Sequence, residues 1–152
     1  MKRTFYLLIS LLTSIITITG CTNKYAYSEQ NLIDSCYWNG QEIVSMDIQY
    51  PQFEGSNFIN LNAVISTKMQ EFEIQYDTLC NTRKADCDND PVFAKLKCYI
   101  DVSYTVIIKN KEVLVTFSVC EFGGGAAEHG YTETIVYNVK TQQHSEIKSD
   151  FY

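Results

Sequence analysis

The side chains best suited to chemistry gather around one glycine-rich segment, Gly123–Gly130. Glu121 and Glu128 have the residue types of the paired carboxylates that act in glycoside hydrolysis. Cys120 and His129 have the types of a thiol nucleophile and its base. The sequence places no third group to orient either pair, and glutamates in loops are usually solvated. We therefore predict no catalytic residue.

The glycine-rich segment is not a phosphate-binding loop, because its glycines precede a strand pattern and no lysine follows them. Three successive glycines indicate unusual backbone torsions or close approach of another part of the chain. Two interpretations stay open, a recognition edge beside a sheet and a wide strand connection with a bulge. For the first, the predicted ligand-binding residues are Gly123, Gly124, Gly125, Glu128, His129, Gly130 and Tyr131.

The sequence also offers two incomplete metal patterns. The three aspartates of Asp86–Asp90 alternate as in a calcium loop, but Pro91 stands where such a loop has glycine and Lys97 where it has glutamate. His129 and His144, the only histidines, match no ligand spacing. We predict a solvated acidic loop, no metal and no cofactor.

The N-terminus has the features of a lipoprotein signal peptide. Lys2 and Arg3 precede an apolar stretch, Phe5–Ile18, that is too short for a comfortable membrane span. Ile18–Cys21 then resembles a lipobox, which predicts cleavage after residue 20 and a diacylglycerol (with further acylation, palmitate for example) on Cys21. The alternative is an uncleaved anchor helix; either way the remaining chain lies outside the cytoplasm. Thr22 favours the outer membrane, if the cell has one.

Charge narrows the class of partner. The whole chain carries −6, and loss of the two leader cations leaves −8 on the mature protein. This acidity argues against binding to nucleic acid or to an anionic membrane and suits a basic protein partner. The N-terminal lipid, and not a basic patch, is expected to hold the protein on the membrane.

The cysteines predict a partly disulfide-bonded domain, because envelope compartments permit disulfides. Five remain after Cys21, so at least one stays unpaired. Cys80 with Cys87, across a short polar loop, and Cys98 with Cys120, at neighbouring strand ends, are the predicted pairs, which leaves Cys36 over. The alternative is a set of buried free thiols.

The elements that position these residues predict an α+β fold, with one amphipathic helix packed on a mainly antiparallel sheet in the order strand, helix, strand, strand, strand. The helix spans Ser56 to about Tyr76, with Ser56 as N-cap. The predicted strands are 42–50, which Pro51 ends, 99–108, 113–120 and 131–139, with a tight turn at Asn110-Lys111. The remaining segments are a polar tether at 22–29, an ambiguous stretch at 31–39, a polar loop at 78–94 and a tail at 141–152, within a division into a signal peptide (1–20), an N-terminal segment (21–41) and a domain (42–152).

Part of this pattern resembles a known family. It is similar to the PdaC-like domain found in the extracellular part of lysozyme-sensing anti-sigma factors and beside the catalytic domain of PdaC-type peptidoglycan deacetylases. The matching pieces, in family order, are Ile48–Pro51, Ile59–Asn62, Tyr104, Val113–Phe117, Gly124-Gly125, His129–Tyr131, Tyr137–Gln142 and Asp150-Phe151.

The resemblance implies a non-catalytic envelope module that recognises a lysozyme-like protein or a peptidoglycan fragment. Two departures stand out: Ala126, Ala127 and Glu128 lengthen the turn before His129, and the family continues beyond the segment that matches Asp150-Phe151 into a second half. The alternatives are an envelope enzyme acting on cell-wall glycan and a structural lipoprotein without a soluble ligand.

Overall fold

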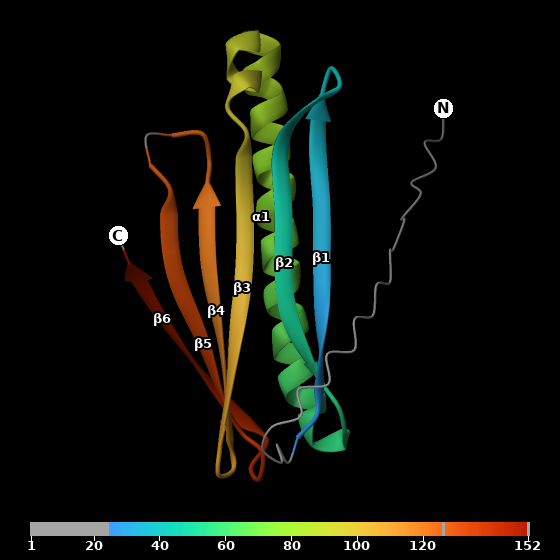
Figure 1. The fold of residues 1–152 in the computed structure, drawn as a ribbon, viewed down its shortest axis with the longest axis vertical. Coiled ribbons are helices and arrows are strands. Elements are labelled where there is room, and N and C mark those ends of the chain that lie inside the picture. Colours follow the sequence, from blue (N-terminus) through green and yellow to red (C-terminus); the bar gives the residue numbers. More distant parts are fainter. Residues whose placement is uncertain (1–24, 126, 152) are drawn as a thin grey trace, which may run out of the picture.

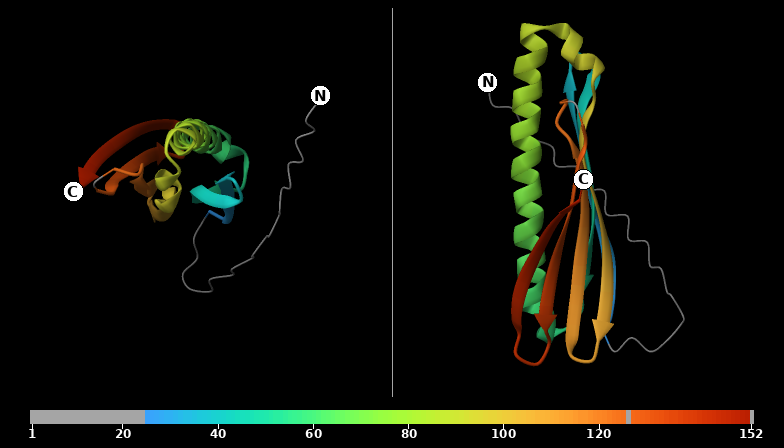
Figure 2. Two further views of the ribbon diagram at one scale, coloured as in Figure 1. Left: turned by 90° about the horizontal axis from the view of Figure 1, so that it is seen from above. Right: turned by 90° about the vertical axis from the view of Figure 1, so that its left-hand side faces the viewer.

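A computed structural model describes residues 25–125 and 127–151, and it confirms the α+β fold class. One long helix lies along one face of a six-stranded sheet whose strands follow the order β1-β2-β3-β4-β5-β6 (Figures 1 and 2). Among the described residues, no helix covers the other face of the sheet (Figure 2). The strands are β1 (Tyr27–Trp38), β2 (Gln41–Phe53), β3 (Cys98–Lys109), β4 (Glu112–Phe122), β5 (His129–Asn138) and β6 (Gln143–Phe151), and the helices are η1 (Ser56–Phe58), α1 (Ile59–Asn89) and η2 (Pro91–Lys95).

The helix explains the single parallel pairing in the sheet. β2 and β3 are parallel, with Val44 opposite Cys98, whereas all other neighbours are antiparallel. A parallel connection needs a long crossover, and α1 supplies it. The turn predicted at Asn110-Lys111 is confirmed, and Asn110 has a φ of 58°.

The helix is longer than the sequence analysis predicted, and its start differs. It ends at Asn89 instead of near Tyr76, so the predicted polar loop at 78–94 is wrong. The buried stripe continues through Cys80, Arg83 and Cys87, because two thiols and the aliphatic part of an arginine can face a core. Ser56 does not cap the helix; it opens η1, and the N-cap residue of α1 makes no side-chain cap bond.

The sequence analysis missed two strands and predicted a third, β2, to be too short. β1 occupies the segment interpreted as tether and ambiguous stretch, and β6 occupies the predicted tail. Both are edge strands with mostly exposed side chains, so they lack the apolar alternation that marks an inner strand. Pro51 does not end β2: it lies opposite Glu29 of β1 and beyond Val44–Ile48, the part of β2 that pairs with β3.

The core fills the space between α1 and the helix-facing side of the sheet. The largest fully buried side chains include Tyr137, Phe117, Ile43, Ile48, Leu61 and Ile65. The Tyr137 hydroxyl donates to the carbonyl oxygen of Asn57 at 2.6 Å, which ties β5 to the start of the helical segment. Within the described residues, no helix combines the length and the apolar character that a membrane span requires.

Candidate ligand groove

A groove of about 450 Å³ lies between the middle of α1 and the segment that joins β4 to β5. We call it the α1 groove. Helix side chains form one wall and the end of β4 with the start of β5 forms the other. Its lining residues are Gln75, Thr78, Leu79, Thr82, Ile100, Glu121, Phe122, Gly123, Ala127 and His129.

Glu121 is the polar centre of the α1 groove. Its carboxylate accepts a short hydrogen bond from the side-chain amide of Gln75 on the helix. The other carboxylate oxygen lies 3.2 Å from Nδ1 of His129, the residue opposite Glu121 in the β4–β5 pairing. The Glu121 side chain is 23% exposed and that of His129 is 55% exposed. A ligand in the groove can therefore reach a carboxylate whose position is already fixed by two neighbours.

The structure separates the residues that the sequence analysis grouped at the glycine-rich loop. Gly123 and His129 line the α1 groove. Glu128 instead accepts a short hydrogen bond from the Tyr99 hydroxyl. Tyr131 is buried in the core beneath Lys148, whose Nζ lies 4.0 Å from the ring centroid, and burial raises the pKa of its hydroxyl to about 12. The tyrosine ring is thus part of the core.

Gly124 has a packing role. Its φ is +86°, and a Cβ there would lie 2.9 Å from Nη1 of Arg83 and 3.2 Å from Sγ of Cys98. Arg83 is only 3% exposed, and its Nη2 donates to the carbonyl oxygens of Phe93 at 2.7 Å and Leu96 at 2.9 Å. The guanidinium thereby joins α1, η2 and the glycine-rich loop. For this glycine the interpretation as close backbone approach is confirmed.

The helix residues of the groove were missed. Gln75, Thr78 and Thr82 are polar positions beside the apolar stripe, and polar residues there look solvated in a sequence. Thr78 and Thr82 also fell in the segment interpreted as a loop. The one available signal was that Gln75 directly precedes the buried Tyr76 and so lies near the edge of the stripe.

The two catalytic pairs considered from sequence are not assembled. Cys120 lies opposite Asp101 and Gly130 and lines a pocket on the far face of the sheet, whereas His129 lines the α1 groove. Glu121 and Glu128 are held by different partners, Gln75 and Tyr99. Neither arrangement brings a base to a nucleophile.

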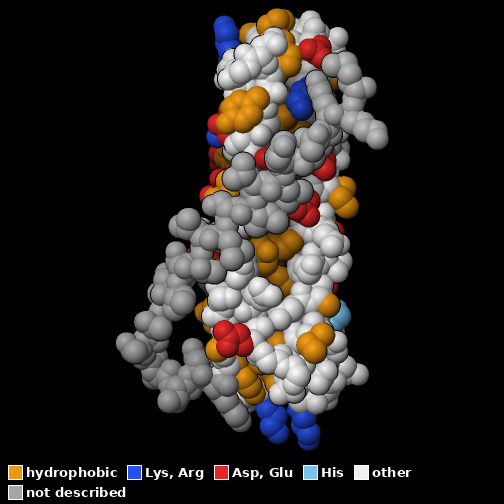
Figure 3. All heavy atoms as spheres, turned by 90° about the vertical axis from the view of Figure 1, so that its right-hand side faces the viewer, with side chains coloured by type: hydrophobic (Ala, Val, Ile, Leu, Met, Phe, Trp, Pro, Cys, Tyr) orange, Lys and Arg blue, Asp and Glu red, His pale blue; other side chains and the backbone are white. Residues whose placement is uncertain are grey.

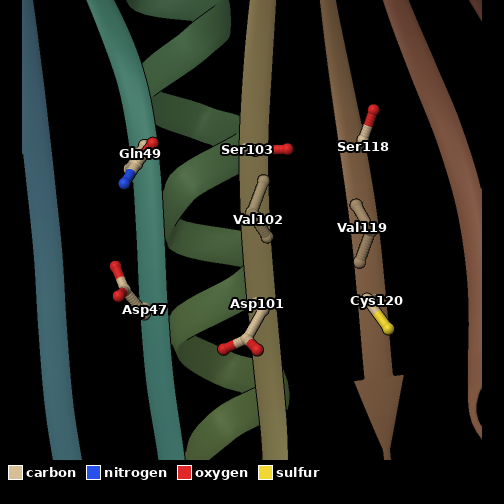
Figure 4. Close-up of a pocket in the computed structure, with 8 residues that line it drawn as sticks. All are labelled: Asp47, Gln49, Asp101, Val102, Ser103, Ser118, Val119 and Cys120. Atoms are coloured by element: carbon tan, nitrogen blue, oxygen red, sulfur yellow. The ribbon is translucent and has the colours of Figure 1, made fainter.

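The pocket on the far face has a volume of about 420 Å³ and is lined by residues of β2, β3 and β4 (Figure 4). Asp47 and Asp101 lie side by side on β2 and β3, with Cys120 on β4 next to them. Partial burial raises the pKa of Asp101, the negative charge of Asp47 raises it further, and Lys97 acts in the opposite direction. Two carboxyl groups side by side repel each other when both are charged. They would also repel an anionic ligand, so this pocket is a poor site for one.

Both predicted disulfides are wrong in this structure, in which all five described cysteines are free thiols. Cys80 and Cys87 lie on one helix, where seven residues correspond to about 10 Å along the axis, beyond the reach of a disulfide. Cys98 points into the core, whereas Cys120 belongs to the far face of the sheet. The first error follows from the misassigned loop and the second from the alternation of side chains along a strand.

The acidic segment Asp86–Asp90 is not a solvated loop but the last turn of α1 and its cap. Asp86 approaches Arg83, Asp88 accepts from the Trp38 indole at 2.8 Å, and Asp90 accepts from the backbone of η2. Each aspartate thus has a separate structural partner. In the described part of the chain, no three or more His, Cys, Asp or Glu side chains are grouped so as to hold a metal ion.

Comparison with known proteins supports the fold and little more. No family model and no curated protein matches the chain. Among solved structures, it is similar to a member of the DUF3298 family from Bacteroides fragilis, with a TM-score of 0.53 and 13% identity over 78% of this chain. The chain spans 58% of that protein's length. The likeness shows a shared fold, and the PdaC-like resemblance remains a resemblance.

Proposed function

We propose that this protein is a non-catalytic binding module of the cell envelope, held by a lipid on Cys21, and that its α1 groove takes a glycan-containing peptidoglycan fragment. The observation that carries the proposal is the composition of the groove around Glu121. Carboxylate, amide, imidazole and hydroxyl groups stand beside apolar side chains, within a volume typical of small-molecule sites.

Sugars are recognised by hydrogen bonds to their hydroxyls and by apolar contact with their ring faces. In the α1 groove, Glu121, Gln75 and His129 offer polar contacts, and Leu79, Phe122 and Ile100 offer apolar ones. The Gln75 and His129 contacts hold the Glu121 carboxylate in place before a ligand arrives. Such preorganisation lowers the entropic cost of binding.

A non-catalytic role is supported by the way these acidic side chains are engaged. Glu121 is the single carboxylate among the residues that line the groove, and Glu128 is bonded to Tyr99 instead. Glycoside hydrolysis uses two carboxyl groups that face the same bond, and the groove residues do not supply the second one.

A lysozyme-like protein is the second candidate ligand, favoured by the net charge of −6 and the pI of about 4.8. Charge of this sign raises the association rate with a basic protein more than the affinity, and salt screens it. The two candidates therefore differ in their expected response to salt.

The deciding experiment is calorimetric titration of the mature chain, residues 21–152 with Cys21→Ser, at low and high salt. The titrants are a disaccharide-peptide from peptidoglycan and, separately, a basic lysozyme. For the fragment we expect saturable binding that salt changes little and that Glu121→Gln weakens about 10- to 100-fold, since a hydrogen bond to a charged group is worth about 1.5–3 kcal/mol.

Asp47→Asn is the matched control, because it removes one carboxylate from the far face of the sheet. Equal loss in both variants, or no heat from a folded protein, contradicts the groove proposal. Salt-sensitive heat with lysozyme alone moves the second candidate forward.

A further inference from the structure

One end of the molecule, opposite the α1 groove, is built from segments that are far apart in sequence. It comprises η1, the β3–β4 turn and the β5–β6 turn, and we call it the turn end (lower end in Figure 1). The backbone N–H of Val139 donates to the carbonyl oxygen of Lys111 at 2.8 Å and joins the two turns. The side chain of Asn60 reaches that of Gln142 at 3.4 Å. The turn end is therefore one continuous surface.

The chain enters the domain at the turn end. The ring of Tyr25 packs against that of Phe58 with centroids 5.0 Å apart, and the backbone N–H of Glu54 donates to the carbonyl oxygen of Ala26 at 3.0 Å. Only three residues separate Tyr25 from Cys21. Four residue steps span at most about 14 Å. A lipid on Cys21 thus brings this end close to the bilayer.

The turn end differs in charge from the rest of the protein. Lys109, Lys111 and Lys140 are exposed in its two turns, against the acidic side chains of Glu54 and Glu112. Figure 3 shows basic side chains projecting at this tip. The whole chain carries −6, so the remainder of the domain is strongly acidic. Three lysines against two glutamates leave an excess of positive charge at the turn end, so the acidic excess lies in the rest of the domain and an anionic surface attracts the turn end.

We propose that the turn end docks on the anionic surface of the membrane, with Lys109, Lys111 and Lys140 contacting lipid headgroups. This inference rests on the lipid at Cys21 that forms part of the proposed function. It revises the expectation that acidity opposes any contact with an anionic membrane, because the charge is segregated and not uniform. The lipid supplies the attachment, and the lysines supply the orientation.

Docking in this orientation sets the height of the α1 groove. Glu112 begins β4 at the turn end and Glu121 lies in the groove, nine residues along the strand. At about 3.3 Å per residue this is about 30 Å. The groove then opens well above the headgroups, where a cell-wall fragment is accessible.

Each lysine near an anionic surface is expected to change the equilibrium constant between the undocked and docked states about fivefold. Loss of all three is then expected to change it by the order of a hundredfold. The interaction is tethered, so weak contacts suffice at the high effective concentration that a short linker provides.

The experiment uses the full lipidated chain reconstituted into vesicles of brominated phosphatidylcholine and phosphatidylglycerol in equal parts. Bromine quenches tryptophan only close to the bilayer. Trp38, the sole native tryptophan, lies at the opposite end, because eleven residue steps of β1 from Tyr27 span about 36 Å. Trp38→Phe with Thr141→Trp moves the probe to the turn end, and Trp38→Phe with Ile59→Trp is the alternative if the first variant fails to fold.

We expect quenching of the turn-end probe and not of Trp38. Changing the three turn-end lysines to glutamine should reduce that quenching, whereas Lys84→Gln, Lys95→Gln and Lys97→Gln together, at the other end, should not. Equal quenching at both probe positions, or at neither, in protein that floats with the vesicles overturns the docking and leaves the lipid anchor standing. Quenching that is independent of the lysines also overturns it. If the protein does not float with the vesicles, the lipid anchor and the docking are both overturned. Binding of a peptidoglycan fragment is measured in a separate titration, so its outcome does not depend on this experiment.

Discussion

Substitution of Gly124 by alanine is the sharpest test of how the end of α1 is held to the sheet. The new Cβ would lie 2.9 Å from Nη1 of Arg83, on a backbone with a φ of +86°. A left-handed conformation costs a non-glycine residue about 1–2 kcal/mol. Displacing the guanidinium weakens its bonds to Phe93 and Leu96, which as charged hydrogen bonds are worth about 1.5–3 kcal/mol each. We expect Gly124→Ala to lower the free energy of unfolding by about 2–4 kcal/mol.

The assay is urea unfolding followed by Trp38 fluorescence and circular dichroism. Gly125→Ala is the matched control, because a Cβ there meets nothing within 4 Å and its φ is not positive. We expect a change of at most about 0.5 kcal/mol for the control. A loss below 1 kcal/mol in Gly124→Ala, or an equal loss in both variants, refutes the argument.

A double-mutant cycle separates the two contributions. Arg83→Met keeps a long apolar stem but removes the guanidinium, so it leaves the carbonyl oxygens of Phe93 and Leu96 without these donors. In that background Gly124→Ala should cost only the backbone term, about 1–2 kcal/mol. Full additivity of the two changes means that the alanine does not act through Arg83.

Two further predictions concern the thiols and the far face of the sheet. Burial raises the pKa of the Cys80 thiol to about 12, so a maleimide reagent should modify half-buried Cys120 first in the native protein, as mass spectrometry of peptides can show; equal rates contradict this. The pKa of Asp101 is raised by partial burial and by Asp47, so its charged form disfavours folding and stability is lost as the pH rises through that pKa. Asp101→Asn should therefore match the wild type in unfolding experiments near pH 3 and be equally or more stable at pH 7, and a clear loss of stability at pH 7 contradicts the reasoning.

The inner strands could be predicted because their side chains alternate between a buried and a solvated face. β3 and β4 show this pattern over most of their length, and the sequence analysis placed both within a few residues. β1 and β6 could not be found in this way, because an edge strand of a sheet with one solvated face needs few apolar residues. Their pairing comes from backbone hydrogen bonds with β2 and β5, which leave no mark in the side-chain pattern.

The C-terminal part of α1 and the groove could not be predicted from the sequence for a related reason. Cys80 and Cys87 suggested a disulfide-bonded loop, yet both thiols lie in the core on the helix stripe. Arg83 is charged, and only the geometry of η2 shows that its guanidinium has buried partners. The groove depends on where α1 crosses the sheet, so its helix residues could not be singled out from a pattern of polar positions.

The contacts of Arg83 with Phe93, Leu96 and Gly124 decide how a loss of ligand binding in a variant is interpreted. Gly124 is adjacent to Gly123 of the groove, and Arg83 follows Thr82 of the groove on α1. A change at Gly124 or Arg83 therefore alters the shape of the groove and the stability of the domain together. Glu121, by contrast, is bonded to Gln75 and His129 and is independent of the Arg83 contacts. A ligand that depends on the groove should thus lose affinity in Glu121→Gln at wild-type stability, and in Gly124→Ala only together with a fall in stability.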